Sequence, residues 1–123
     1  GDTWVYDVAL NQWREMTPTV SPQRRFAHMM TYDEASDRIL LFGGYSGTIQ
    51  GKDDRWFNDI WLYDITTNLW ERLAAEGETP SPRGYAALES DPSRSRLLLH
   101  AGISGIEGVL DDLWELEVLP ASQ

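Results

Sequence analysis

Residues 58 to 70 read Asn-Asp-Ile-Trp-Leu-Tyr-Asp-Ile-Thr-Thr-Asn-Leu-Trp, and this stretch decides the fold. Short runs with apolar and aromatic residues at alternating positions lie on either side of the polar turn Thr66-Thr67-Asn68. An alternation of period two places Ile60 and Leu62 on one face of a strand and Trp61 on the other. Two such runs joined by a short turn predict a β-hairpin.

The hairpin pattern occurs three times in the chain. Trp4 belongs to an earlier copy and lies 57 residues before Trp61, while Trp114 belongs to a later copy and lies 53 residues after it. The segment between hairpins also repeats, because residues 25–44 match residues 83–102 at an offset of 58. A sequence period of 50 to 60 residues indicates a repeat architecture in which each repeat is one structural unit.

Each repeat has about four runs with strand character, which we label a to d. In the middle repeat they are Arg25–Tyr32, Arg38–Gly43, Asp59–Ile65 and Leu69–Leu73. Four short strands per repeat, with no competing helical period, predict an all-β β-propeller segment made of four-stranded antiparallel blades.

The repeats divide the chain into a partial blade at 1–19 (strands c and d), a complete blade at 20–77 and a partial blade at 78–123 (strands a, b and c). Nine strands are too few to close a ring of such blades. We therefore expect a piece from the C-terminal part of a longer propeller, which associates with the remaining blades or with another chain. Exposed sheet edges would favour that association.

Composition excludes several classes of partner. The net charge is −10 and only Lys52 among the 10 basic residues is a lysine, which argues against nucleic acid, because phosphate backbones need clustered positive charge. The absence of cysteine excludes disulfides and thiolate metal sites. No apolar run approaches the ~20 residues of a membrane span, so no membrane partner is expected.

A set of glycine, tyrosine, tryptophan and arginine residues recurs at matching positions of the repeats. A glycine pair follows an apolar strand, and six residues separate a later tyrosine from a tryptophan. The members of this set are Tyr6, Trp13, Arg25, Gly43, Gly44, Tyr63, Trp70, Arg83 and Gly102. This pattern resembles the kelch repeat over nearly the whole chain. The pattern also includes the run Arg25-Phe26-Ala27-His28, and the third copy departs from it, with Ala86 in place of His28, Ala101 in place of Gly43 and Leu116 in place of Tyr63.

The resemblance implies roles for these residues. The glycine pair would allow a sharp turn at the strand end and a close approach of backbones. Trp13 and Trp70 would each be buried between blades. Arg25 and Arg83 begin equivalent strands and would bind loop carbonyls as structural residues, with a ligand contact as the alternative.

No catalytic residue, metal site or cofactor is expected. Gly44-Tyr45-Ser46-Gly47-Thr48 lacks the last glycine of a nucleophile elbow and predicts a structural turn. His28 and His100 fall in predicted strands, which favours packed, hydrogen-bonded histidines over metal ligands. The pairs Asp53-Asp54 and Asp111-Asp112 lack a calcium-loop pattern and predict solvated turn charge.

The candidate binding residues lie in the loops at one end of the blades. Strands alternate in direction, so the b–c and d–a loops emerge together at Tyr45–Phe57, Ile103–Leu110, Thr17–Arg24 and Ala74–Pro82. Exposed loops on a rigid scaffold often carry binding sites. The side chains chosen there are of types that dominate interfaces, namely Arg24, Tyr45, Lys52, Arg55 and Trp56. Alternatively, Trp56 packs under its own loop.

Function is expected from the resemblance, because kelch propellers are chiefly protein-interaction scaffolds. The expected function is therefore a module that binds a protein or peptide, and not an enzyme. Two alternatives stay open. Some kelch-like propellers are enzymes, such as the galactose oxidase group and sialic acid epimerases, so the chain could be a segment of a propeller enzyme or glycan-binding protein. It could also be a purely architectural piece of an assembly.

Overall fold

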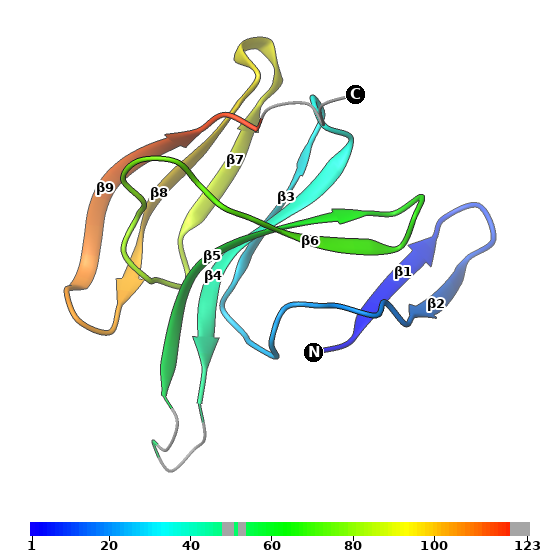
Figure 1. Ribbon diagram of the computed structural model, residues 1–123, viewed down its shortest axis with the longest axis horizontal. Coiled ribbons are helices and arrows are strands. Elements are labelled where there is room, and N and C mark those ends of the chain that lie inside the picture. The colour runs from blue at the N-terminus through cyan, green and yellow to red at the C-terminus, as the bar shows by residue number, and fades with distance from the viewer. Residues whose placement is uncertain (48–50, 52–53, 119–123) are drawn as a thin grey trace.

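A computed structural model of the chain describes residues 1–47, 51 and 54–118 (Figure 1). These residues form nine β-strands and one short 3-10 helix. The elements are β1 (Thr3–Asp7), β2 (Gln12–Met16), β3 (Met29–Asp33), β4 (Arg38–Ser46), β5 (Arg55–Asp64), β6 (Leu69–Leu73), β7 (Ala87–Asp91), η1 (Pro92–Arg94), β8 (Arg96–Ser104) and β9 (Gly108–Leu116).

The strands pair antiparallel in three sheets. Their orders are β1-β2, β3-β4-β5-β6 and β7-β8-β9. Figure 1 shows the four-stranded sheet between the other two, with β7 beside β3. The predicted fold class, all-β with antiparallel blades of a propeller, is confirmed.

The hydrophobic core lies between the four-stranded and the three-stranded sheets. Alternation along β4 and β5 brings Leu40 and Leu62 into one cluster with Leu97 and Leu99 of β8. Leu40, Leu62 and Leu97 are each only 1% exposed. Full burial of such a side chain contributes about 1.5–3 kcal/mol, so this interface holds the two sheets together.

β4 and β5 continue past the glycine pair, so the predicted loop at Tyr45–Phe57 is wrong. The two strands pair as far as Ser46 and Arg55. Their register shifts between Phe42 and Gly44, which marks a β-bulge. The bulge inserts one extra residue and lets pairing resume beyond it, because it bends the strand without ending it.

The third sheet repeats this geometry and corrects the predicted loop at Ile103–Leu110. β8 and β9 pair as far as Ser104 and Gly108. The register shift here lies between His100 and Gly102. In both sheets the strand pairing therefore extends further than the sequence predicted.

The glycine pair allows the close approach of backbones that the resemblance implied. Gly43 and Gly44 have φ values of +69° and +106°, in the left-handed region that favours glycine. A Cβ built on Gly43 would lie 2.5 Å from the Arg83 carbonyl oxygen, which belongs to the next repeat. The equivalent of Gly43 in the third copy is Ala101, which keeps the same backbone at φ +66°.

The predicted strand Arg25–Tyr32 begins later than expected. Ala27 has a φ of +59°, which interrupts the extended backbone, so β3 begins at Met29. Before this break, Phe26 still forms an isolated bridge with Tyr45. The segment before β3 is thus tied to β4 without being a regular strand.

The paired tryptophans occupy equivalent positions but differ in burial. Tyr63 pairs with Trp70 across β5 and β6, and Tyr6 pairs with Trp13 across β1 and β2. Trp70 is half-buried, and its Nε1 donates a hydrogen bond of 3.1 Å to Thr3 Oγ1 of the neighbouring sheet. Trp13 is 67% exposed, so its predicted burial between blades is wrong in this chain. No other sheet among the described residues covers its face.

Main-chain hydrogen bonds join the second and third sheets in a seam. Gly44 N donates to Arg83 O at 2.8 Å, and Arg83 N donates to Phe57 O at 3.1 Å. Tyr85 N donates to Ala27 O at 3.0 Å. The segment before β7 is therefore bonded to the four-stranded sheet through its own backbone, whichever side chains it carries.

Candidate binding face

The two long hairpins and the segments that precede β3 and β7 end at one side of the sheets, in the lower part of Figure 1. We call this end the loop face. It is defined by the described residues Arg24, Phe26, Tyr45, Arg55, Trp56 and Tyr85. Four of these were predicted to bind. Lys52, the remaining candidate, lies outside the described residues.

Three aromatic rings form a row at the base of the β4–β5 hairpin. The centroids of Tyr45 and Trp56 are 4.8 Å apart, and those of Tyr45 and Phe26 are 5.1 Å apart in an edge-to-face arrangement. Such ring pairs contribute about 0.5–1.5 kcal/mol beyond their buried area. Phe26 is 50% exposed, whereas the other two rings are half-buried. The row therefore stiffens the hairpin and presents one ring, Phe26, to solvent.

Trp56 packs against the neighbouring sheet. A Cβ built on Gly105, in the β8–β9 turn, would lie 2.3 Å from Trp56 Nε1. A Cβ on Gly84 would lie 3.3 Å from the same indole. The alternative that Trp56 packs under its own loop is thus corrected, because the ring bridges two blades and only glycine leaves room for it.

Tyr85 was missed by the sequence analysis and is the most exposed ring of the loop face. Its side chain is 64% exposed and its backbone has a φ of +56°. It occupies the position equivalent to Ala27, which has the same left-handed backbone. A bulky residue with positive φ is uncommon. The amino-acid sequence does not reveal this backbone conformation, so Tyr85 could not be identified from it.

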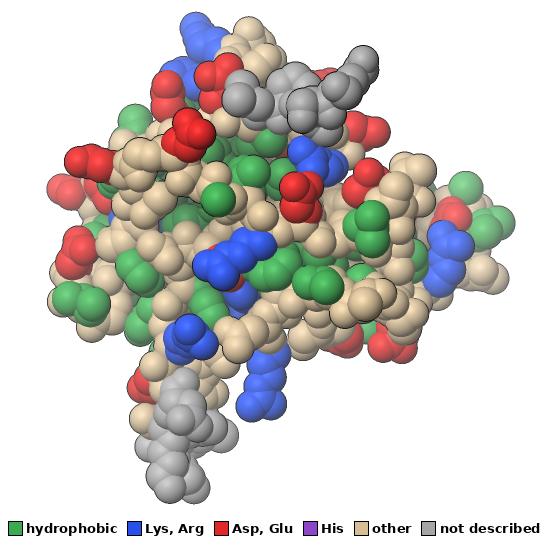
Figure 2. All heavy atoms as spheres, viewed as in Figure 1, with side chains coloured by type: hydrophobic (Ala, Val, Ile, Leu, Met, Phe, Trp, Pro, Cys, Tyr) green, Lys and Arg blue, Asp and Glu red, His purple; other side chains and the backbone are tan. Residues whose placement is uncertain are grey.

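Two arginines add positive charge to the loop face. Arg24 and Arg55 are exposed, and no carboxylate among the described residues forms an ion pair with either. Arg55 NH1 donates a long hydrogen bond of 3.4 Å to Gln23 Oε1. Figure 2 shows arginine side chains (blue) near the base of the β4–β5 hairpin, with most Asp and Glu side chains elsewhere in this view.

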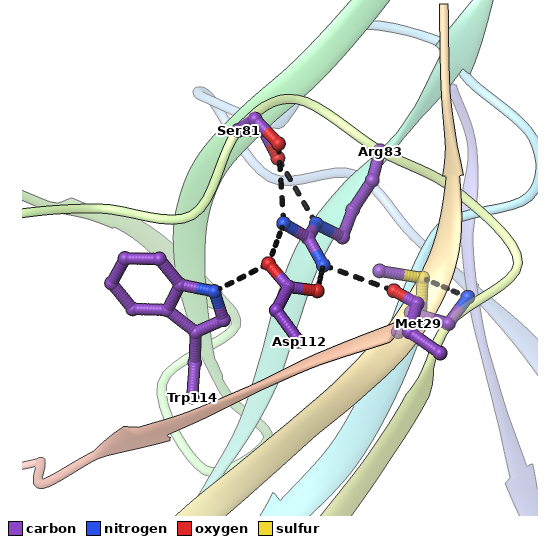
Figure 3. Close-up of polar contacts among 7 residues, drawn as sticks. Met29, Ser81, Arg83, Asp112 and Trp114 are labelled. Carbon is purple, nitrogen blue, oxygen red and sulfur yellow. Dashed lines mark hydrogen bonds and ion pairs between the residues drawn. The ribbon is translucent and has the colours of Figure 1, made fainter. Parts of the chain in front are cut away.

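Beneath the loop face, two arginines with buried side chains hold the strands by ion pairs. Arg83 is 0% exposed and donates to both carboxylate oxygens of Asp112 at 2.6 and 2.8 Å (Figure 3). It also donates to the Ala101 carbonyl at 3.0 Å. Arg25 makes the equivalent contacts with Asp59, at 2.6 and 3.0 Å. These contacts support the structural role expected for both arginines.

Asp112 corrects the prediction that Asp111-Asp112 is solvated turn charge. Hydrogen bonds from Arg83, and a further one from Trp114 Nε1 at 2.8 Å, hold the pKa of Asp112 well below its usual value. The same arrangement lowers the pKa of Asp59, where burial opposes the shift but the bonds from Arg25 and Trp61 outweigh it.

The signal for these partners was present in the sequence as Asp-x-Trp. At the start of the three repeated hairpins it occurs as Asp2-Thr3-Trp4, Asp59-Ile60-Trp61 and Asp112-Leu113-Trp114, whereas Asp54-Arg55-Trp56 has the same pattern outside this repeated position. In each copy the indole Nε1 donates to the carboxylate two residues earlier, at 2.7–2.8 Å. At Asp59 and Asp112, the carboxylate fixed by the indole is oriented to receive an arginine from the segment that precedes the first strand of its sheet.

The histidines are not the packed, hydrogen-bonded residues that were predicted. His100 is exposed on β8. His28 lies just before β3, and its buried Nδ1 has no hydrogen-bond partner among the described residues. Burial and the nearby positive charge of Arg25 lower the pKa of His28. The residues Gly44 to Ser46 of the rejected nucleophile elbow belong to β4 and its bulge, which corrects the predicted turn.

The described part of the chain contains no cluster of three or more His, Cys, Asp or Glu side chains placed to hold a metal ion. Its one helix, η1, has three residues, and no helix there could cross a membrane.

Comparison with known proteins places this geometry in a family. Residues 1–121 match the family model described as the KLHDC2/KLHL20/DRC7 Kelch-repeats domain. The chain is 27% identical over 106 residues, 85% of its length, to the dynein alpha chain of the flagellar outer arm from Chlamydomonas reinhardtii. It is 32% identical over 65 residues, 53% of its length, to dynein regulatory complex subunit 7 from the same organism.

A third relative carries the repeat in its name. The chain is 28% identical over 80 residues, 64% of its length, to kelch domain-containing protein 3 from Bos taurus. The matches cover 2%, 5% and 19% of these three relatives, so the chain spans only a small part of each. The family match spans both glycine bulges, both buried arginines and the paired tyrosines and tryptophans. The chain therefore belongs to the KLHDC2/KLHL20/DRC7 Kelch-repeats domain family.

Proposed function

We propose that the chain is a protein-binding module whose loop face takes a peptide segment of a partner. One observation carries the proposal. The loop face exposes the rings of Phe26 and Tyr85 on the same side as Arg24 and Arg55, which form no ion pair with a described carboxylate, on a chain whose net charge is −10. Aromatic and arginine side chains supply most of the binding energy at protein interfaces. The proposal assigns this face binding and no catalytic step.

Membership of a kelch family supports the proposal, because kelch domains commonly bind proteins. One relative is by its name a subunit of a dynein regulatory complex, which is an assembly of proteins. The stiffness of the hairpins adds to this support. Residues fixed by a packed aromatic row and by a bulge lose little freedom when a partner binds.

The chemistry of the face favours a partner segment with acidic and apolar side chains. Arg24 and Arg55 would pair with carboxylates, and arginine can do so through two parallel hydrogen bonds. Phe26 and Tyr85 would contact apolar side chains. Positive charge on this face also steers acidic segments toward it, although the rest of the chain repels them.

A peptide array with varied acidic, basic and apolar content tests the proposal. We expect bound peptides to be enriched in Asp and Glu next to apolar residues. The double variant Arg24→Glu/Arg55→Glu should weaken binding at least tenfold, and Phe26→Ser should weaken it about three- to tenfold, in line with the cost of truncating interface side chains.

Arg94→Glu is the matched control, because Arg94 is exposed on η1, which precedes β8 at the opposite end of the sheets. Changes at Glu34 and Ser93, in turns at that end, should also leave binding unchanged. If these control variants abolished binding while the loop-face variants kept it, the face would be wrongly assigned. If no peptide bound, the architectural alternative would replace the proposal.

A further inference from the structure

A cavity of about 420 Å³ lies between the four-stranded and the three-stranded sheets. Its walls come from both sheets, and it is covered by the loop that connects β6 to β7. This volume is within the usual range of sites for small molecules, about 300–1,000 Å³. The cavity is separate from the loop face, since none of the residues that define that face lines it.

The walls of the cavity are apolar. Leu40, Phe42 and Ile60 line it from the four-stranded sheet, and Leu99 and Trp114 line it from the three-stranded sheet. The first four are at most 5% exposed, so they form a fixed wall of the core. An apolar cavity that is not filled by side chains binds apolar molecules readily, because water finds no hydrogen-bond partners in it.

The loop that covers the cavity is acidic. Glu76 and Glu78 both border the cavity and lie in the exposed loop that covers it. No ion pair joins either carboxylate to a cation among the described residues. The loop is anchored beyond them by Asn58, whose Nδ2 donates to the Pro80 carbonyl at 3.3 Å.

Two further glutamates border the cavity, Glu115 on β9 and Glu117 just beyond its end. Glu115 is paired with Arg96 at 2.8 Å. Glu117 is exposed and forms no ion pair with a described cation. The carboxylates that border the cavity without a described cationic partner are therefore the loop pair, Glu76 and Glu78, together with Glu117.

We propose that this cavity binds a small amphiphilic cation, with its apolar body between the sheets and its ammonium group beside Glu76 and Glu78. The apolar walls select the body, and the two carboxylates favour a positive head group over a negative one. The net charge of −10 acts in the same direction by raising the local concentration of cations.

Binding of decyltrimethylammonium and of decyl sulfate, both below their micellar concentrations, tests this inference. Isothermal titration gives the affinities, and methyl chemical shifts of the core leucines show whether the ligand enters the cavity. We expect the cation to bind and the anion to bind at least tenfold more weakly. The double variant Glu76→Gln/Glu78→Gln should weaken binding of the cation roughly fivefold, as expected for two exposed charge contacts.

The matched control is Glu15→Gln/Glu34→Gln, which removes the same charge at two exposed positions away from the cavity. Leu88→Trp, at the cavity wall, should fill the space and abolish binding; its circular dichroism spectrum shows whether it remains folded. Equal binding of cation and anion, or an unchanged affinity in the Glu76→Gln/Glu78→Gln variant, would overturn the proposed head-group preference. Methyl shifts confined to residues outside the cavity would overturn the site itself.

Discussion

Arg83 and Asp112 form a bidentate ion pair at 2.6 and 2.8 Å, although 29 positions separate them in the sequence. The arginine is fully buried and joins the segment before β7 to β9. We expect Asp112→Asn to lower the free energy of unfolding by about 1–3 kcal/mol, because it leaves a buried guanidinium short of its counter-charge. Urea unfolding measures the change. The control is Glu71→Gln, which breaks the ion pair between Glu71 and Arg38. The Glu71 side chain is 66% exposed, so this substitution should lower the free energy of unfolding by less than about 1 kcal/mol.

The two low-pKa aspartates predict a loss of stability in acid. The unfolded carboxyl groups take up protons near pH 4, whereas Asp59 and Asp112 in the folded chain stay ionised to lower pH. The unfolded state therefore binds more protons in this range, so the free energy of unfolding falls as pH decreases below about 4. Chemical unfolding at a series of pH values should show a shallower fall for Asp112→Asn. An equal dependence of the unfolding free energy on pH in the two proteins would contradict the lowered pKa of Asp112.

His28 predicts a second, milder pH dependence. Burial and the charge of Arg25 lower its pKa below the usual value of 6.5, so the unfolded chain protonates first as pH falls. The free energy of unfolding should then decrease as pH drops below about 6.5, until His28 also protonates in the folded chain. His28→Gln should remove this component, and His100→Gln, at an exposed position, should not. The same unfolding series measures both variants.

The left-handed positions at the bulges predict opposite effects of alanine and glycine. Gly43→Ala should destabilise the fold by more than about 1 kcal/mol, since the new Cβ would meet the Arg83 carbonyl at 2.5 Å. Ala101→Gly should raise stability by up to about 1 kcal/mol, because it relieves the same backbone at φ +66°. Gly77→Ala is the control for backbone strain alone, as no atom lies within 4 Å of its Cβ. Thermal unfolding ranks the three.

The two equivalent tryptophans should differ in their importance for stability. Trp70→Ala should lower the free energy of unfolding by about 2–4 kcal/mol, because the ring packs on Tyr63 at 4.9 Å and donates a hydrogen bond to Thr3. The ring is only half-buried, so the loss should be smaller than for a fully buried tryptophan. Trp13→Ala should cost less than about 1 kcal/mol, since that side chain is 67% exposed. Denaturant unfolding of both variants checks this. A Trp70→Ala protein with an unchanged midpoint would show that the ring does not tie the sheets together.

Features that repeat along the chain could be predicted from the sequence. Period-two alternation and the offset of 58 between copies were enough to predict the fold class and the antiparallel hairpins. The extension of β4 and β5 was not predictable, because residues 45–57 contain two glycines and four charged residues, which normally indicate a loop. A β-bulge lets β4 and β5 continue to pair beyond the glycine pair. The bulge depends on backbone φ angles, which cannot be read from the amino-acid sequence.

The candidate site was predicted less completely than the fold. Exposure is a property of the neighbours that a residue meets in space, so Tyr85 and Trp13 could not be assigned to the surface from their positions in the repeat. The partner of each buried arginine also depends on tertiary packing. The repeated Asp-x-Trp was nevertheless visible, and it identifies Asp59 and Asp112 once the indole hydrogen bonds are known.

The seam of main-chain bonds between the second and third sheets has a consequence for recognition. Gly44, Arg83 and Tyr85 donate through backbone amides, so the angle between the two hairpins is fixed before any ligand arrives. A partner would meet the bases of the two hairpins at a set separation and would not need to bring them together, which reduces the entropy lost on association. Amide exchange at these three residues should therefore be slow and concerted, and hardly altered when a ligand binds.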